Sequence, residues 1–198
     1  MSDLIDQVAE SVESEGFPEW IDPMLATLVD EAFSDDEWIF ERKLDGERCL
    51  VYLNDGQARL MSRNGKKLNN AYPEIADWFE ERSNRDMIVD GELVAFDGDV
   101  TSFQRLQPRM QIDDPEQARQ SNVAVYYYAF DILHLEGEKT SDLPLRKRKE
   151  ILRRALDFDD PVRFTRHRNT YGEDYYDEAC ADGWEGLIAK DATAPYVT

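Results

Sequence analysis

The amino-acid sequence predicts an α+β domain built from antiparallel sheets, and three observations support this fold class. Asp-Gly pairs at 55–56 and 97–98 follow stretches rich in strand-forming residues, which is a signal for tight hairpins. Helical segments opened by proline or a capping residue lie between the hairpins without regular alternation with strands. A hydrophobic fraction of 41% over 198 residues is enough for one packed core.

The first part of the chain is expected to lie outside that core. Residues 1–22 are rich in acids and show no clear hydrophobic period, so we expect a loosely held N-terminal arm that includes at most a short helix. The domain itself is expected to cover residues 23–198, starting at Pro23.

The first expected strand is followed by a hairpin of two more. Residues 38–43 alternate in character like a strand, and the chain then turns at Asp45 and Gly46. Residues 49–53 and 57–62 flank an Asn-Asp-Gly turn and should pair with each other. Pro73, followed by apolar residues at helical spacing, predicts a helix as far as residue 82.

The remaining elements follow the same two types of signal. Residues 87–96 and 123–133 are rich in Val, Ile, Tyr and Phe, and should be strands. Helices are expected over 102–110, 115–120, 145–156 and 171–181, and a final strand over 186–190.

The charge balance limits how the chain can meet nucleic acid. Lys and Arg number 23 against 43 Asp and Glu, which gives a formal net charge of -20. Such a surface repels phosphates, so any contact with nucleic acid must be local. The excess of acids also suggests a high-salt habitat.

One basic region stands out against this background and is a candidate contact for DNA phosphates. Its residues are Arg146, Lys147, Arg148, Lys149, Arg153, Arg154, Arg163, Arg166 and Arg168. A helix with a solvated charged face is the alternative explanation.

Neither a membrane span nor a secretory leader is evident. The longest apolar stretches are far shorter than the roughly 20 residues that a span requires. The N-terminal residues are acidic and lack a basic leader. We therefore expect a cytoplasmic protein.

Residues 41–48, Glu-Arg-Lys-Leu-Asp-Gly-Glu-Arg, carry the first sign of chemistry. They place a lysine at a strand end, which suits nucleophilic attack on a phosphate. Only a neutral amine attacks, and nearby positive charge makes it easier for the lysine to lose its proton. Candidates for the source of this charge are Arg48, Lys190 or a bound metal ion. A surface hairpin with solvated charges explains these residues alone equally well.

Five segments in fixed order resemble the motifs of covalent nucleotidyltransferases, which include DNA ligases, RNA ligases and mRNA capping enzymes. They are residues 43–48 (Lys-Leu-Asp-Gly-Glu-Arg), 62–65 (Ser-Arg-Asn-Gly), 90–94 (Asp-Gly-Glu-Leu-Val), 128–131 (Tyr-Ala-Phe-Asp) and 185–190 (Glu-Gly-Leu-Ile-Ala-Lys). Residues 23–26, Pro-Met-Leu-Ala, also resemble the opening of bacterial and archaeal ligase domains. The chain is most similar to the adenylation domain of ATP-dependent DNA ligases. This implies two antiparallel sheets flanked by helices around a nucleotide cleft, an ATP-grasp-like ligase fold.

The resemblance implies roles for four residues around the nucleophile. Lys43 would form a phosphoramidate with the AMP of ATP. Glu41 would accept a hydrogen bond from the adenine amino group. Arg48 and Arg63 would hold the ribose and phosphates, and Arg63 is also a candidate for binding the 5′-phosphate at a nick.

It implies roles for four residues further along the chain. Phe130 would stack on adenine, and Lys190 would lie near the phosphates. Glu92 would contact a ribose hydroxyl or a metal ion. Glu185 would help bind Mg²⁺, with Mn²⁺ as an alternative ion, because carboxylates are hard oxygen ligands.

The implied activity is the sealing of nicks in double-stranded DNA by a monomeric ligase in replication, repair or recombination. AMP would pass from ATP to the lysine, then to the 5′-phosphate at the nick. Family members continue into a fifth motif with two lysines and usually an oligonucleotide-binding domain, whereas this chain ends at Thr198. We therefore expect a truncated adenylation domain in which adenylation and sealing are slow. Leu44 stands where many of these ligases have tryptophan.

Other functions stay open on the same residues. One alternative is an RNA ligase or a GTP-using capping enzyme, which would have the same fold. Another is a non-catalytic fragment that binds nucleotide or DNA through the same motif residues. The segments at 23–26 and 62–65 favour the DNA enzyme. An NAD-dependent ligase is disfavoured because no separate nicotinamide-recognition segment is evident before Lys43.

Overall fold

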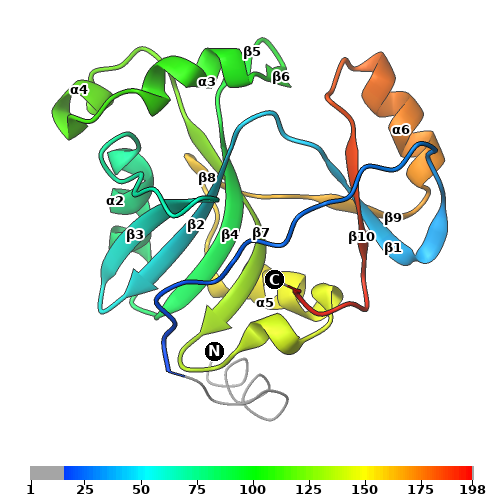
Figure 1. Ribbon diagram of the computed structural model, residues 1–198, viewed down its shortest axis with the longest axis horizontal. Helices are drawn as coiled ribbons and strands as arrows, with labels where there is room; N and C mark the ends of the chain where they lie inside the picture. Colours follow the sequence, from blue (N-terminus) through cyan, green and yellow to red (C-terminus); the bar gives the residue numbers. More distant parts are fainter. Residues whose placement is uncertain (1–15, 198) are drawn as a thin grey trace.

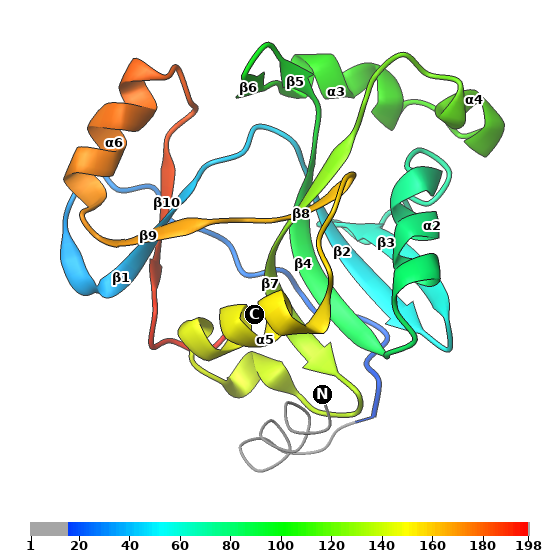
Figure 2. The same cartoon turned by 180° about the vertical axis from the view of Figure 1, so that it is seen from behind.

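Two main sheets with flanking helices make up the chain in a computed structural model that describes residues 16–197 (Figure 1). The larger sheet has the strand order β3-β2-β4-β7-β8, and the smaller has the order β10-β1-β9. A two-stranded ribbon, β5-β6, stands apart from both. Figures 1 and 2 show the two main sheets side by side, joined by the chain between β1 and β2 and by that between β8 and β9.

The predicted helices and strands lie close to their expected positions, whereas β6, η1, β8 and β9 were not predicted. The strands are β1 (Asp35–Arg42), β2 (Glu47–Asn54), β3 (Gln57–Ser62), β4 (Met87–Val94), β5 (Phe96–Asp97), β6 (Val100–Thr101), β7 (Tyr126–Leu135), β8 (Val162–Phe164), β9 (His167–Thr170) and β10 (Leu187–Asp191). The helices are α2 (Pro73–Arg82), α3 (Phe103–Met110), α4 (Pro115–Arg119), the 3-10 helix η1 (Thr140–Asp142), α5 (Leu145–Ala155) and α6 (Gly172–Ala181).

The hairpin of β2 and β3 forms where the sequence predicts it. Asp55 and Gly56 both have positive φ, 50° and 73°, which is the conformation that an Asp-Gly turn favours. β2 then pairs antiparallel with β4, and β4 with β7, so that β4 is central in the sheet. The α+β class is therefore confirmed.

One face of the larger sheet carries the main core. Alternate residues of β2, namely Cys49, Val51 and Leu53, are buried on this face. The helices α2, α3 and α5 add apolar side chains to the same cluster, which are Ile75, Trp78, Phe79, Leu106, Ile151 and Leu152. These helices cover one face of the sheet, and a second, smaller apolar cluster that includes Leu50, Tyr52, Ile88 and Leu133 lies on its other face.

The opposite face is partly covered by the N-terminal segment. Phe17 and Trp20 pack on Tyr52, with ring centroids 6.5 and 6.4 Å away. The N–H of Ile21 donates to the Tyr52 hydroxyl at 2.9 Å. Residues 16–22 of the expected arm thus lie in extended chain against the sheet, and residues 1–15 of that arm lie outside the described residues.

The prediction of purely antiparallel sheets is wrong at one pair, because β8 runs parallel to β7. The chain between these strands contains η1 and α5, and a crossover of that length brings the next strand back in the same direction. β8 has only three residues and β9 has four polar ones, so neither carries a pattern long enough to reveal a strand. Among residues 16–197, no helix has the length and apolar character needed to cross a membrane.

Candidate active site

The predicted site residues gather where the end of β1 faces the uncovered part of the larger sheet. Glu41 and Lys43 are two positions apart, so they project from the same face at the end of β1. Arg48 is the second residue of β2, and Glu92 lies opposite it on β4. Because β1 belongs to one sheet and β2 to the other, the turn between them brings the two sheets together at this point (Figure 1).

Lys43 is fixed by its backbone and by one ion pair. Its N–H donates to the carbonyl of Gly186 at 2.9 Å, which continues the β1–β10 pairing past the strand end. Its ammonium contacts the Glu185 carboxylate, and both side chains are 41% exposed. The amine is therefore accessible and has a carboxylate as its counter-ion. This differs from the expected neighbours, since the cations Arg48 and Lys190 are paired elsewhere.

Glu41 is buried and held by two lysines. Its side chain is 3% exposed, with Lys149 on one oxygen and the Lys190 ammonium 2.7 Å from the other. Burial raises the pKa of this carboxyl, but the two ammonium groups together lower it by more than burial raises it. The pKa of Glu41 therefore lies below the usual value. Glu41 is therefore an ionised acceptor at neutral pH.

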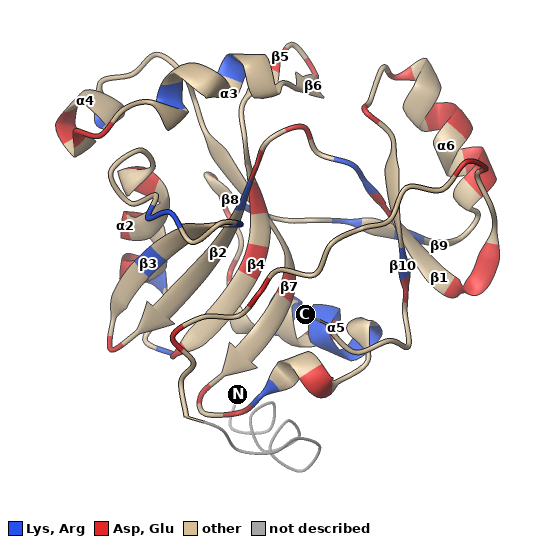
Figure 3. Cartoon of the chain, viewed as in Figure 1, with Lys and Arg blue, Asp and Glu red and all other residues tan. Residues whose placement is uncertain are grey.

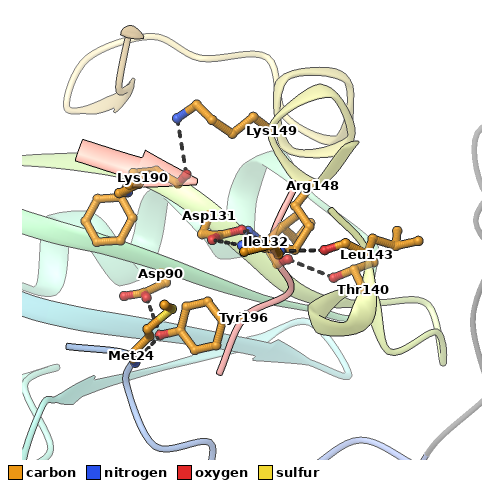
Figure 4. Close-up of polar contacts among 12 residues, drawn as sticks. Met24, Asp90, Asp131, Ile132, Thr140, Leu143, Arg148, Lys149, Lys190 and Tyr196 are labelled. Carbon is orange, nitrogen blue, oxygen red and sulfur yellow. Dashed lines mark hydrogen bonds and ion pairs between the residues drawn. The ribbon is translucent and has the colours of Figure 1, made fainter. Parts of the chain in front are cut away.

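Arg48 is anchored in a polar cluster on the sheet. Its guanidinium donates two hydrogen bonds of 2.6 Å to Asp90, which is fully buried. The hydroxyl of Tyr196 donates to the same carboxylate at 2.6 Å and accepts from the N–H of Met24 at 2.9 Å. Figure 4 shows Tyr196 between Asp90 and Met24. These bonds tie both ends of the described chain to the middle of β4.

Phe130 on β7 lies beneath two cations. The Arg48 guanidinium is 4.7 Å from the ring centroid and the Lys190 ammonium is 4.2 Å from it. Cations within about 6 Å of a ring are attracted to its face. Phe130 thereby connects the Arg48 cluster on one sheet to the Glu41 cluster on the other.

Glu92 is half-buried between the nucleophile candidate and Arg48. Burial raises the pKa of Glu92 to about 8, although the charges of Arg48 and Lys43 act in the opposite direction and Asp90 and Glu47 add to the rise. A carboxyl with this pKa is largely protonated at neutral pH and takes up a cation readily as the pH rises.

A pH-dependent stability difference is expected from Glu92. Its folded pKa of about 8 lies above the ordinary 4.5, so the folded protein keeps a proton that the unfolded chain has lost between these pH values. Its contribution to stability therefore falls as pH rises through that window. Glu92→Gln removes this loss. The difference in melting temperature, variant minus parent, should therefore increase by about 2 °C or more between pH 5 and pH 9, which corresponds to about 1 kcal/mol of unfolding free energy. A difference that stays constant across the window contradicts this.

Arg63 lies apart from the other predicted site residues. It lies exposed in the turn after β3, one position past the pairing of Ser62 with Cys49, and so beside the start of β2. The structure gives it no contact with the Lys43 pair. Gly46, at the turn after Lys43, has no room for a side chain, because a Cβ there would collide with the carbonyl of Leu93 on β4.

Sequence reasoning missed Lys149, Asp90 and Tyr196. Asp90 stands two positions before Glu92 in its motif, and that spacing places both on one face of β4. Lys149 was part of the basic region interpreted either as a contact for DNA phosphates or as a solvated helix face, but Arg148 and Lys149 are buried in ion pairs. In the ribbon of Figure 3, blue Lys and Arg positions recur on α5, and red Asp and Glu positions recur on α6 and at the start of β1.

No complete metal centre is evident among residues 16–197. No group of three or more His, Cys, Asp and Glu side chains is close enough to hold a metal ion there. A hollow of about 410 Å³ lies beside β5 and α3, away from Lys43. Its lining residues are Phe96, Gly98, Asp99, Arg105, Asn122, Ala124, Tyr126 and Arg163.

Comparisons with known proteins agree on one family. A family model described as "ATP dependent DNA ligase domain" matches residues 23–198. The "Multifunctional non-homologous end joining protein LigD" of Pseudomonas aeruginosa is 34% identical over 182 residues, which are 90% of this chain and 21% of that protein. A DNA ligase of Natronomonas pharaonis is 34% identical over 81% of this chain and 30% of its own length. A solved structure of mycobacterial DNA ligase D complexed with ATP and MES is similar with a TM-score of 0.73 and 29% identity, covering 88% of this chain and 55% of that one. The chain thus spans between a fifth and a third of these curated relatives.

Proposed function

We propose a covalent adenylation reaction at Lys43, starting from the fact that this chain belongs to the family of ATP-dependent DNA ligase domains. The observation that carries the proposal is the partly exposed Lys43–Glu185 pair at the end of β1. It places an accessible amine beside a carboxylate, in electrostatic reach of Glu92.

The reaction uses the neutral amine of Lys43 as the nucleophile. The Lys43 ammonium first loses one proton to solvent. Its nitrogen then attacks the α-phosphorus of ATP, an N–P bond forms as the P–O bond to pyrophosphate breaks, pyrophosphate leaves, and a second proton passes from the nitrogen to solvent. The ammonium is held by Glu185 in the free protein, so it must lose this counter-ion before the amine is set free. Binding of a divalent ion by Glu185 would have that effect.

Adenine recognition is assigned to Glu41 and Phe130. Glu41 is ionised and buried, which suits acceptance of a hydrogen bond from an amino group. The ring of Phe130 on β7 is connected to Glu41 through Lys190, whose ammonium contacts both side chains. Arg48 and Arg63 are assigned to the ribose and phosphates, and they stand next to Cys49 and Ser62, which pair with each other between β2 and β3.

The residues fit a Mg²⁺ ion that is held partly by the nucleotide. Mg²⁺ usually binds one or two carboxylates together with substrate phosphates, and Glu185 and Glu92 offer such oxygens. Bound there, the ion would neutralise negative charge on the leaving pyrophosphate. Glu92, with a pKa of about 8, would release its proton as it takes part.

The proposed substrate of the later steps is nicked double-stranded DNA. The AMP group would pass from Lys43 to the 5′-phosphate at the nick, and the 3′-hydroxyl would then displace it. This proposal is supported by the names of the relatives, which are DNA ligases, and one of them acts in non-homologous end joining. A cytoplasmic setting and a role in DNA replication, repair or recombination are part of the same proposal.

Substrate choice tests this function against its neighbours. Labelled ATP should label the chain at least about tenfold faster than labelled GTP, since the Glu41 carboxylate would face the O6 carbonyl of guanine. The adenylated chain should pass AMP to nicked DNA in preference to a nicked RNA duplex of the same sequence. Equal labelling by GTP, transfer to RNA alone, or ATP binding without a covalent label would each contradict the proposal.

A further inference from the structure

The two oxygens of Glu41 are divided between two lysines from different elements. Lys149 extends from α5 to one oxygen, and Lys190 on β10 lies 2.7 Å from the other. The carboxylate and Lys149 are each 3% exposed at the side chain, so their pair is fully buried.

The two lysines are held very differently. The Lys149 ammonium also donates to the carbonyls of Phe130 at 3.3 Å and Thr165 at 3.2 Å, so all three of its hydrogens have acceptors. Lys190 is 22% exposed, and its ammonium rests on Glu41 and on the ring of Phe130. Lys190 can therefore exchange its partners for water or phosphate, whereas moving Lys149 would leave buried acceptors unpaired.

The Lys190 ammonium occupies the two contacts that a bound base would need. It covers a face of Phe130 and engages the outer oxygen of Glu41, the two groups assigned to adenine. A base that stacks on this face and donates to that oxygen must displace Lys190. Once Lys190 has left, Lys149 is the remaining lysine on Glu41.

We propose that Lys149 is a positioning residue that holds Glu41 as the acceptor for the 6-amino group of the base, while Lys190 yields the other oxygen when the base binds. This rests on the function proposed above. The bond from Lys149 to the Phe130 carbonyl adds to this role, because one ammonium then fixes the acceptor relative to the stacking residue. Without Lys149, burial would favour the protonated Glu41, which offers a weaker acceptor.

The test compares ATP with purine ribonucleoside triphosphate, which lacks the 6-amino group. The rate of covalent labelling of the 198-residue chain, divided by KM, is measured for both nucleotides. The parent chain should prefer ATP by about tenfold to one hundredfold, the range for a hydrogen bond to a charged group. Lys149→Met should reduce this preference to about threefold or less, mainly through KM for ATP.

Control variants separate positioning from general damage. Lys147→Met removes a lysine from the exposed side of the same helix and should keep the full preference for ATP. Lys149→Arg retains the charge and should restore part of the preference. If Lys149→Met does not fold, Lys149→Gln keeps a polar group at this position, and the same loss of preference is expected.

Failure of this inference is distinguishable from failure of the proposed function. If the parent chain takes no covalent label from ATP, the proposed function is wrong and this inference falls with it. If the parent is labelled at Lys43 and the folded Lys149 variants keep the parent's ATP preference, the inference alone is overturned.

Discussion

Lys43→Ala should lower covalent labelling by ATP at least about 10³-fold, because removing a nucleophile removes the reaction rather than weakening it. Lys43→Arg should be equally inactive, since a guanidinium keeps its proton and cannot attack phosphorus. Radiolabelled ATP and acid precipitation measure the effect directly.

The Lys43 variants should remain folded. The side chain is 41% exposed and its pair with Glu185 lies at the surface, where such pairs contribute about 0–1 kcal/mol to stability. The melting temperature is therefore expected to change by no more than about 4 °C. Acid-stable label that persists in a folded Lys43→Ala protein would show that another residue is the nucleophile.

Arg148→Met should destabilise the protein by about 3–5 kcal/mol, the usual effect of removing one partner from a buried ion pair. Arg148 donates two hydrogen bonds, of 2.8 and 2.9 Å, to Asp131, and the side chains are 3% and 5% exposed. It also donates to the carbonyls of Leu143 and Ala194, which secures the C-terminal segment on α5 (Figure 4). Thermal unfolding should show a melting temperature lower by roughly 6–20 °C.

Two controls make this stability prediction specific. Lys147→Met, on the same helix but exposed, should change the melting temperature by no more than about 2 °C. The double variant Arg148→Met, Asp131→Leu should recover much of the loss, because apolar residues can replace a buried ion pair with little penalty. A loss under about 1 kcal/mol in Arg148→Met would contradict the assigned burial.

Local signals account for most of what the sequence predicted. The Asp55–Gly56 turn and the proline at the start of α2 act over a few residues, so a single sequence is enough to locate them. The motifs located Glu41, Lys43, Arg48, Glu92, Phe130, Glu185 and Lys190. Contacts join Glu41, Lys190, Phe130 and Arg48, a separate ion pair joins Lys43 to Glu185, and Glu92 interacts electrostatically with Lys43 and Arg48. Their individual roles in catalysis stay predictions.

The partners in that network were beyond sequence reasoning. Glu41 and Lys149 are separated by 108 positions, and Arg48 and Asp90 by 42, and no local pattern connects residues over such distances. The basic run on α5 was expected at the surface, because burial of a lysine requires an acceptor set that only the folded chain creates. The parallel pairing of β7 and β8 was missed for the same reason, since it depends on how α5 packs.

Peptide mass spectrometry after incubation with ATP and Mg²⁺ tests the central claim most directly. The peptide containing Lys43 should gain the mass of one AMP group, and fragmentation should locate the adduct on the lysine nitrogen. An adduct on any other residue, or none after prolonged incubation of the folded chain, would contradict the adenylation site proposed at the end of β1.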